Sequence, residues 1–470
     1  MPDNLIAARG ATIAFVRTTI VLMAVALLAC SGKVSGSGGG GGSATGGGVA
    51  TGGGSAMGGG GTATGGGGSA TGGGGTGGGG ATGGGAGTGG GTGVPIDGGT
   101  CLMPNPAFTA LEQTLVNLDA GTWFVAPSSK LRAVCPSSGT MGDCANVIDA
   151  WSGGAWDPVH NQMLIFGGGH VDYSGNEVYA FDLATLSWSR LTNPSDPAGK
   201  DQDPLPDGQP ISRHSYDGLQ YETHSNVLFD WGGSEWGMGG GTTVTWQFDP
   251  AAKTWTDRAP AEPTTPNCCS HGTAYDPAGK RVWLHQSNAL YSYDDSANAW
   301  SDVIDFGQPP LWPRYENYGD KTGTVDTSRR LLWFFGSRLY LVFDLDAGMP
   351  VTDSWVTTGG TTFDNTPDVG GHSEEVIMTG GAELITAQGP GLDYDPVADA
   401  LAGWVGGGPW VLDLKSKSWS QQSGAGAPVN TAQHGTFGRW RYVSRVNAFI
   451  LVNSVDDDVY FFKLTPRCGN

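Results

Sequence analysis

Short apolar runs recur through the second half of the chain and follow one simple pattern. Residues 178–181 and 339–343 are runs of this kind, and their length and composition predict β-strands. Residues 163–166 and 227–231 are apolar runs followed directly by glycines, which permit positive φ angles and close approach of two backbones. The pattern predicts an all-β domain of many short strands.

A repeated unit joins these strands. Each unit ends one strand in an apolar residue followed by an aspartate, and a tryptophan opens the next strand. In four of five units the tryptophan follows the aspartate by six residues; the pairs are Asp182 and Trp188, Asp249 and Trp255, Asp294 and Trp300, Asp344 and Trp355, and Asp413 and Trp419. The fourth pair is longer, which we interpret as an insertion at residues 347–350. The aspartate can accept hydrogen bonds in a tight turn, and the tryptophan offers a large apolar surface.

The order of a glycine pair, an aromatic residue, six further residues and a tryptophan resembles the kelch repeat over residues 118–465. Membership of that family, which belongs to the wider galactose oxidase-like superfamily, implies one four-stranded β-propeller blade per repeat. A sixth unit begins near Thr436 and ends after Phe462 without a tryptophan strand. Because an open edge strand can pair with other chains, we expect the segment around Trp123 to complete it. The prediction is a six-bladed propeller closed by an N-terminal strand; a degenerate blade within residues 361–389 would make seven.

The N-terminus differs in composition from the repeats. Two arginines precede an apolar run at residues 20–29, which is shorter than the ~20 residues that span a bilayer and typical of a secretion signal. The run ends at Leu27-Leu28-Ala29-Cys30 and resembles the bacterial lipobox. That resemblance implies a signal peptide at residues 1–29, a lipidated Cys30 and, from the serine that follows, an outer-membrane lipoprotein on the periplasmic or cell-surface side. An ordinary signal peptide is the alternative.

Residues 30–100 contain mostly Gly, Ala, Thr and Ser. Such a segment lacks apolar side chains to offset the entropy lost on ordering, so we expect a disordered, flexible tether that carries a propeller domain at residues 101–470. We expect contact with a membrane through the lipid anchor only, and a monomer. The formal net charge of −20 argues against nucleic acid as a partner.

Six cysteines remain once Cys30 is assigned to lipid. An even number in an exported protein favours disulfides over metal thiolates. The sequence leaves the connectivity open; the predicted pairs are Cys101–Cys468, Cys135–Cys144 and Cys268–Cys269, the last with the alternative that adjacent cysteines pair elsewhere.

Polar residues gather in the loops that a propeller places on one face. These are the loops that enter the innermost strand of each blade and the loops that join the second and third strands of the blade. They are His170, Asp172, Tyr173, Arg213, His214, His271, Arg314, Tyr315, His434 and Arg439, with His372 as a further histidine in the segment before blade five. Because propeller mouths are concave and collect polar groups, we expect a ligand site there. The alternative for each histidine is a structural, hydrogen-bonded role.

Three functions compete for this mouth. The first is a binding module for a glycan or protein partner, with contacts from aromatic and arginine side chains such as Tyr173, Trp236, Tyr315 and Arg439. The second is a polysaccharide-active enzyme that resembles propeller lyases, in which His214, Tyr315 and Arg314 would act as base, acid and carboxylate-neutralising group.

The third function is a metal site built from His170, His214, His271 and His434. Copper-radical chemistry of the galactose oxidase-like kind is disfavoured because the predicted disulfides use the cysteines. Residue patterns typical of a serine nucleophile elbow, a P-loop or a dinucleotide fingerprint are absent from the sequence. The cofactor and the existence of a reaction stay open.

Overall fold

The computed structural model describes residues 107–199, 202–237, 240–261, 269–286, 289–305, 319–337, 339–350, 361–362, 375–376, 380–429 and 431–466. Contacts divide the chain after Gly85, and every described residue belongs to the C-terminal unit. Within these ranges, no helix has the length and apolar character needed to cross a membrane. The predictions for Cys30, Arg314, Tyr315, His372 and the Cys101–Cys468 pair fall outside the described residues.

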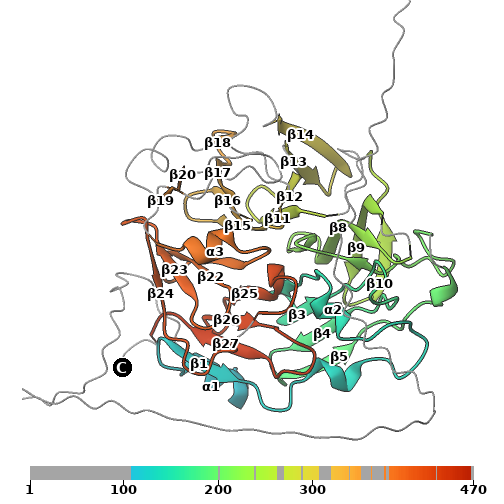
Figure 1. Cartoon of the computed structure of the whole chain (residues 1–470), viewed down its shortest axis with the longest axis horizontal. Coiled ribbons are helices and arrows are strands. Elements are labelled where there is room, and N and C mark those ends of the chain that lie inside the picture. The colour runs from blue at the N-terminus through green and yellow to red at the C-terminus, as the bar shows by residue number, and fades with distance from the viewer. Residues whose placement is uncertain are drawn as a thin grey trace, which may run out of the picture. The chain divides into compact units, whose positions relative to one another are not determined.

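Six antiparallel sheets lie around a central axis and form a six-bladed β-propeller (Figure 1). In blades one to five the first strand in the chain lies innermost and later strands lie progressively outward, whereas in blade six the outermost strand comes first in the chain. Blade one contains β2 (Ala155–Asp157), β3 (Gln162–Ile165), β4 (Tyr179–Asp182) and β5 (Ser187–Arg190). Blade two contains β6 (Arg213–His214), β7 (Leu219–Glu222), β8 (Val227–Glu235), β9 (Gly241–Asp249) and β10 (Thr254–Asp257).

The remaining blades follow the same order. Blade three contains β11 (His271–Asp276), β12 (Arg281–Gln286), β13 (Ala289–Asp294) and β14 (Ala299–Asp305). Blade four contains β15 (Thr322–Asp326), β16 (Leu331–Gly336), β17 (Leu339–Asp344) and β18 (Met349–Pro350). Blade five contains β21 (Gly391–Asp395), β22 (Ala400–Trp404), β23 (Trp410–Asp413) and β24 (Ser418–Gln421). Blade six contains β25 (Trp440–Val443), β26 (Ala448–Leu451), β27 (Tyr460–Lys463) and β1 (Thr122–Val125).

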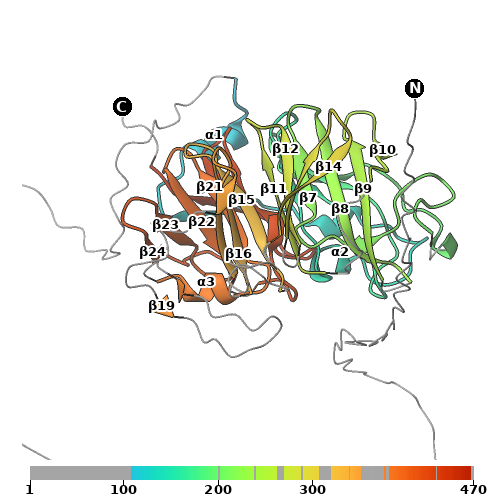
Figure 2. The ribbon, with the colours of Figure 1, turned by 90° about the horizontal axis from the view of Figure 1, so that it is seen from above.

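Short elements connect and flank the blades. They are α1 (Ala110–Val116), α2 (Asn146–Asp149), α3 (Ala382–Thr386), the 3-10 turns η1 (Leu131–Val134), η2 (Pro197–Gly199) and η3 (Phe437–Arg439), and the paired strands β19 (Thr361–Thr362) and β20 (Glu375–Val376). Figure 2 shows α2 and α3 at one end of the blades and α1 at the other. Residues 361–389, in which a degenerate seventh blade was the alternative, contain the two-stranded β19–β20 ribbon and α3. These elements do not form a four-stranded blade, so that alternative is wrong.

The repeated aspartate and tryptophan have the roles that their spacing predicts. In the strand registers Trp188 lies opposite Phe181, Trp255 opposite Phe248, Trp300 opposite Tyr293 and Trp419 opposite Leu412. The aspartate before each turn accepts hydrogen bonds from backbone N–H groups of that turn; Asp413 accepts from Lys415 at 2.8 Å and Ser416 at 2.9 Å. One six-residue spacing therefore sets both the turn and the register of the outermost strand.

Blade four departs from the prediction. Pro350 lies opposite Phe343 in the β17–β18 pair, six residues after Asp344, at the register position that tryptophan holds in the other blades. Residues 347–350 are thus the turn and the start of the outermost strand, and the predicted insertion is wrong. In blade four the spacing from the aspartate defines the register of the outermost strand. The tryptophan, from which the insertion was predicted, does not mark that register. Trp355 itself lies outside the described residues.

Closure of the ring by the N-terminal segment is confirmed. Strand β1 pairs antiparallel with β27, with Trp123 opposite Phe462 and Val125 opposite Tyr460. The Trp123 ring lies 5.1 Å from that of Phe462 and 5.9 Å from that of Trp440. The first described strand therefore supplies the outermost strand of blade six.

The segment before blade one is fixed by a disulfide and by packing. Cys135 and Cys144 are bonded, as predicted. Leu115, Val116 and Ile148 are buried in one apolar cluster with Phe461 of blade six. The N-terminal segment therefore packs against the seam at which the ring closes.

Candidate functional site

The innermost strands all run in the same direction, so the loops that enter them lie on one face of the ring. The loops between second and third strands reach the same face because adjacent strands are antiparallel. We call it the entry face; it includes residues 146–154, 166–178, 211–218 and 431–439. Helices α2 and α3 lie at this end of the blades (Figure 2).

Glycines bring blades one and two into contact at the entry face. Gly169 has a φ of +75°, and a Cβ added there would collide with the Cα atom of Arg213. Gly233 has a φ of +103°, and its Cβ would collide with the carbonyl of His214. The N–H of His170 donates to the Ser234 carbonyl at 3.2 Å. Gly169 thus lets the β3–β4 loop of blade one lie against β6, and Gly233 lets β8 lie close to β6 within blade two.

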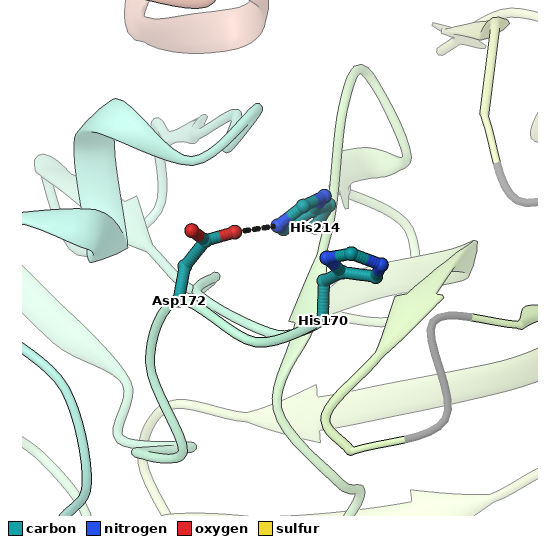
Figure 3. A group of neighbouring side chains, drawn as sticks. All are labelled: His170, Asp172 and His214. Carbon is teal, nitrogen blue, oxygen red and sulfur yellow. Dashed lines mark hydrogen bonds and ion pairs between the residues drawn. The ribbon is translucent and has the colours of Figure 1, made fainter. Parts of the chain in front are cut away.

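Three of the predicted site residues meet at this contact (Figure 3). The Nε2–H of His214 donates to Oδ2 of Asp172 at 2.8 Å. The ring centroid of His170 lies 5.6 Å from that of His214. One donor atom from each of the three residues lies within 4.8 Å of the others. His170 and Asp172 are partly exposed, whereas His214 is buried.

Burial and the hydrogen bond set the charges of this group. Desolvation lowers the pKa of His214, and the hydrogen bond to Asp172 only partly opposes it. The hydrogen bond from His214 lowers the pKa of Asp172. At neutral pH the pair is therefore a neutral imidazole that donates to a carboxylate, and the Nδ1 atom of His214 keeps its lone pair.

Trp151 adjoins these residues and was not predicted. Its ring stacks on that of His434, with centroids 3.5 Å apart, and on that of His214, with centroids 5.0 Å apart. Nδ1 of His434 donates to the Asp149 carbonyl at 2.6 Å. Trp151 is partly exposed and has a φ of +47°, which is unfavourable for a bulky residue. We call Trp151, His170, Asp172, His214 and His434 the rim cluster.

Two further aromatic residues with the same backbone strain lie beside the rim cluster. Tyr216 and Phe437 have φ angles of +46° and +48°, are buried, and have ring centroids 6.0 Å apart in an edge-on arrangement. The Tyr216 N–H donates to the Trp151 carbonyl. Each of these residues stands five positions before an aromatic residue of its innermost strand. That spacing is the sequence signal by which Trp151 could have been found.

Both described arginines of the predicted site are enclosed. Arg213 is fully buried and pairs with Asp203 at 2.5 Å and Asp230 at 3.6 Å. Arg439 is fully buried and donates to the backbone carbonyls of Ser152, Val452 and Gly435. Their donors serve the interior of the propeller, so neither arginine is exposed for contact with a ligand.

Tyr173, His271 and Trp236 are buried as well. The Tyr173 hydroxyl donates to Glu177 at 3.0 Å. His271 contacts the Ser215 carbonyl at 3.3 Å, and burial lowers the pKa of His271 to about 3, which keeps the ring neutral. Trp236 belongs to a small buried apolar cluster. For these three residues the structure favours the structural role over direct contact with a partner.

The remaining predictions concern residues at the edge of, or beyond, the described chain. Cys269 is disulfide-bonded, but Cys268 lies outside the described residues, so their pairing stays a prediction. The lyase function depends on Tyr315 and Arg314, which are also outside them. Of its three residues only His214 is placed, with Asp172 as its partner.

His170, Asp172 and His214 suit a first-row metal ion in donor type and spacing. Two ligands that each lie ~2 Å from one ion are ~3 Å apart, close to the 2.8 Å between Nε2 of His214 and Oδ2 of Asp172. Binding would replace the shared proton with the metal. Two imidazoles and one carboxylate would leave a position open for water or a ligand. His271 and His434 were predicted ligands, but neither belongs to this group of neighbouring donors.

Comparison with known proteins assigns no function to the chain. No family model matches the chain, and no curated protein matches it. Among solved structures, it is similar to a structural genomics protein of unknown function from Bacteroides thetaiotaomicron VPI-5482, with 9% sequence identity and a TM-score of 0.43. The match covers 72% of this chain and 74% of that one. The function must therefore be argued from the rim cluster itself.

Proposed function

We propose that the propeller is a binding module that holds a glycan at its entry face, in contact with the rim cluster. The observation that carries the proposal is Trp151, a partly exposed indole on a left-handed backbone. A bulky residue keeps such a conformation only where the surrounding structure enforces it, and such residues concentrate at functional sites. Packing alone would not call for a partly exposed indole there.

The neighbours of Trp151 suit sugar recognition. The exposed part of the Trp151 indole offers an apolar surface to the C–H groups of a sugar ring, and Asp172 and His170 offer polar groups to its hydroxyls. The stacked rings of His214 and His434 hold the indole in place, so little entropy is lost when a ligand binds. A protein partner is the alternative occupant of the same surface.

A glycan array probed with the purified full-length protein tests this proposal. We expect binding to a defined set of oligosaccharides, weakened at least tenfold by Trp151→Ala and by Asp172→Asn. His160→Ala is the matched control, because His160 is a partly exposed histidine that pairs with Asp157 in blade one and is outside the rim cluster. Binding that survives Trp151→Ala, or the lack of any glycan binding, would overturn the glycan proposal.

A metal-binding function is the second candidate, favoured by the spacing of the donors of His170, Asp172 and His214. Titration with Zn²⁺, Mn²⁺ and Cu²⁺ by calorimetry measures it directly. We expect one ion per chain, lost in His170→Ala and retained in His160→Ala. Equal binding by the two variants would assign the metal to another part of the chain.

We also propose that the chain is exported and anchored by lipid at Cys30, in line with the lipobox-like sequence before it. Radiolabelled palmitate supplied to expressing bacteria should label the protein and not its Cys30→Ala variant. Equal labelling of both proteins would refute the anchor. The proposal for the rim cluster does not depend on this result.

A further inference from the structure

A pocket lies on the propeller axis, at the opposite end of the blades from the rim cluster. It has a volume of about 270 Å³, and all six blades contribute to its lining. Its residues come from the last positions of the innermost strands and the turns that follow. Because the entry face is where these strands begin, the pocket belongs to the other face of the ring.

The lining repeats from blade to blade. Each blade contributes two consecutive strand residues and the residue two positions further on. The second of these strand residues is aromatic in five of the six blades; the six are Trp156, Tyr221, Tyr275, Val325, Tyr394 and Tyr442. Aromatic residues therefore adjoin the pocket in five of the six blades, at one position of the repeat that builds the blades.

The hydroxyl groups of these aromatic residues are largely engaged by protein. The Tyr394 hydroxyl bonds to Ser328 at 2.8 Å and Asp399 at 2.7 Å. The Tyr442 hydroxyl donates to Asn447 at 2.9 Å, and that of Tyr275 contacts His224 at 3.0 Å. The wall thus offers mainly ring surface, and polar recognition must come from other lining residues.

Arg441 supplies that recognition. Its side chain is only 8% exposed, yet it has weak partners: one hydrogen bond of 3.4 Å to the Gly323 carbonyl and an ion pair of 3.7 Å with Asp217. Its buried Nη2 atom makes no hydrogen bond within the described residues. Arg439, two residues earlier, donates from all three of its nitrogens to carbonyls. Arg441 therefore keeps donors available for a ligand.

The carboxyl groups beside Arg441 restrict the charge of that ligand. Asp393 also lines the pocket and accepts hydrogen bonds from Thr324 at 2.7 Å and from the Tyr442 N–H at 2.8 Å. Burial raises the pKa of Asp217 to about 7 although Arg441 opposes it, so this partner is only partly ionised at neutral pH. Arg441 has a single, long ion pair with Asp217 among the described residues and is the one basic side chain among the lining residues. Its charge suits a monoanion, whereas a second negative charge on the ligand would meet carboxyl groups without a further cation.

We propose that this axial pocket binds a small monocarboxylate with a single six-membered ring, whose carboxylate pairs with Arg441 and whose ring lies within the aromatic wall. A guanidinium can bind a carboxylate through two parallel hydrogen bonds. The volume of about 270 Å³ is just below the ~300 Å³ at which ligand pockets usually begin, so only a small ligand fits within it. The rim cluster lies on the entry face, with buried Tyr216 and Phe437 beside it. The axial pocket lies at the opposite end of the innermost strands, so the two sites are distinct.

Calorimetry with matched ligand pairs tests the proposal. The probes are D-glucuronate against D-glucose, benzoate against benzamide, and inorganic phosphate, all at pH 8, where most of the phosphate is the dianion. We expect at least one carboxylate to bind at least tenfold more tightly than its neutral counterpart and than phosphate. The proposal is wrong if no carboxylate shows this preference, or if phosphate binds as tightly.

Variants locate the bound carboxylate. Arg441→Gln should weaken binding at least tenfold, whereas Arg445→Gln should not, because Arg445 is partly exposed and pairs with Glu112. Thr327→Trp, at an exposed position of the pocket rim, should block entry without disturbing the interior, and it decides the matter if Arg441→Gln fails to fold. Unchanged affinity in Thr327→Trp, or loss of affinity in Trp151→Ala, would place the carboxylate elsewhere and overturn the proposal.

Discussion

Trp123 and Phe462 face each other across the strand pair that closes the propeller, with ring centroids 5.1 Å apart. The two residues belong to opposite ends of the described chain. Their contact repeats the pairing of Trp188 with Phe181 inside blade one. The seam between the ends is therefore built with the same side chains as an ordinary blade.

We expect Trp123→Ala to lower the free energy of unfolding by about 2–4 kcal/mol, because it removes a large, mostly buried ring. Val125→Ala is the control on the same strand, since Val125 is 41% exposed and should change stability by under about 0.5 kcal/mol. Denaturant unfolding measures both. Equal effects in the two variants would mean that β1 adds little to the closure.

Loss of the Cys135–Cys144 bond should also destabilise the domain. The bond links residues nine positions apart, and a loop of that length corresponds to about 2–3 kcal/mol of restricted unfolded-chain entropy. The double variant Cys135→Ser/Cys144→Ser should show this loss in denaturant unfolding without reductant. In reductant, which also breaks the disulfide of Cys269, the wild-type protein and the variant should be about equally stable, and a variant as stable as the oxidised wild type without reductant would contradict the prediction.

Gly169→Ala should disturb the rim cluster more than the strain of a positive φ at residue 169 would by itself. A positive φ costs a non-glycine residue about 1–2 kcal/mol, and at Gly169 a Cβ would also collide with Arg213. Gly139→Ala is the matched control, because Gly139 has a φ of +88° and nothing within 4 Å of an added Cβ.

The difference between the two glycine variants isolates the contact between blades one and two. Gly169→Ala should lose more stability than Gly139→Ala and should weaken ligand binding at the rim cluster. The measurements are denaturant unfolding and the array binding described above. Equal stability and equal binding would show that the close approach of the two blades is not required.

Asp217 should make stability depend on pH. Burial raises the pKa of Asp217 to about 7 in the folded protein, against ~3.9 for an unfolded aspartate. The folded state then holds the proton more tightly, so this contribution to stability is complete below pH ~4 and is lost as pH rises to about 7. Asp217→Asn should remove this slope while an amide oxygen still accepts from Thr273 and Gly323, as Asp217 now does. Unfolding free energies of both proteins from pH 4 to 8 test it, and parallel curves would contradict the pKa shift.

The sequence was sufficient for the architecture because local chemistry and strand register share one spacing. An aspartate that caps the turn and a residue six positions later define the outer strand pair in every blade whose turn is described. Pro350 shows the limit of this reasoning: it takes the register position of a tryptophan without the residue type that identifies it. Closure by Trp123 could be predicted because the sixth unit lacked a tryptophan strand, while the segment around Trp123 belonged to no other unit.

The site was only partly predictable. His170, Asp172 and His214 could be placed near each other from the loops that carry them, since the propeller assigns those loops to one face. Arg439 looks like a surface residue in the sequence, yet each of its three side-chain nitrogens donates to a backbone carbonyl in the interior. One of these carbonyls, that of Ser152, is 287 residues away in the chain, and a one-dimensional pattern does not contain that information.

Pairing of β1 with β27 also orders events during synthesis. The ribosome releases Thr122–Val125 long before their partner Tyr460–Lys463. Until then the nascent domain has an unpaired strand at each side of the gap, and its last blade cannot form. A chain that stops before Tyr460 would expose both edges to aggregation or to degradation, so a closed domain requires translation to continue past Lys463.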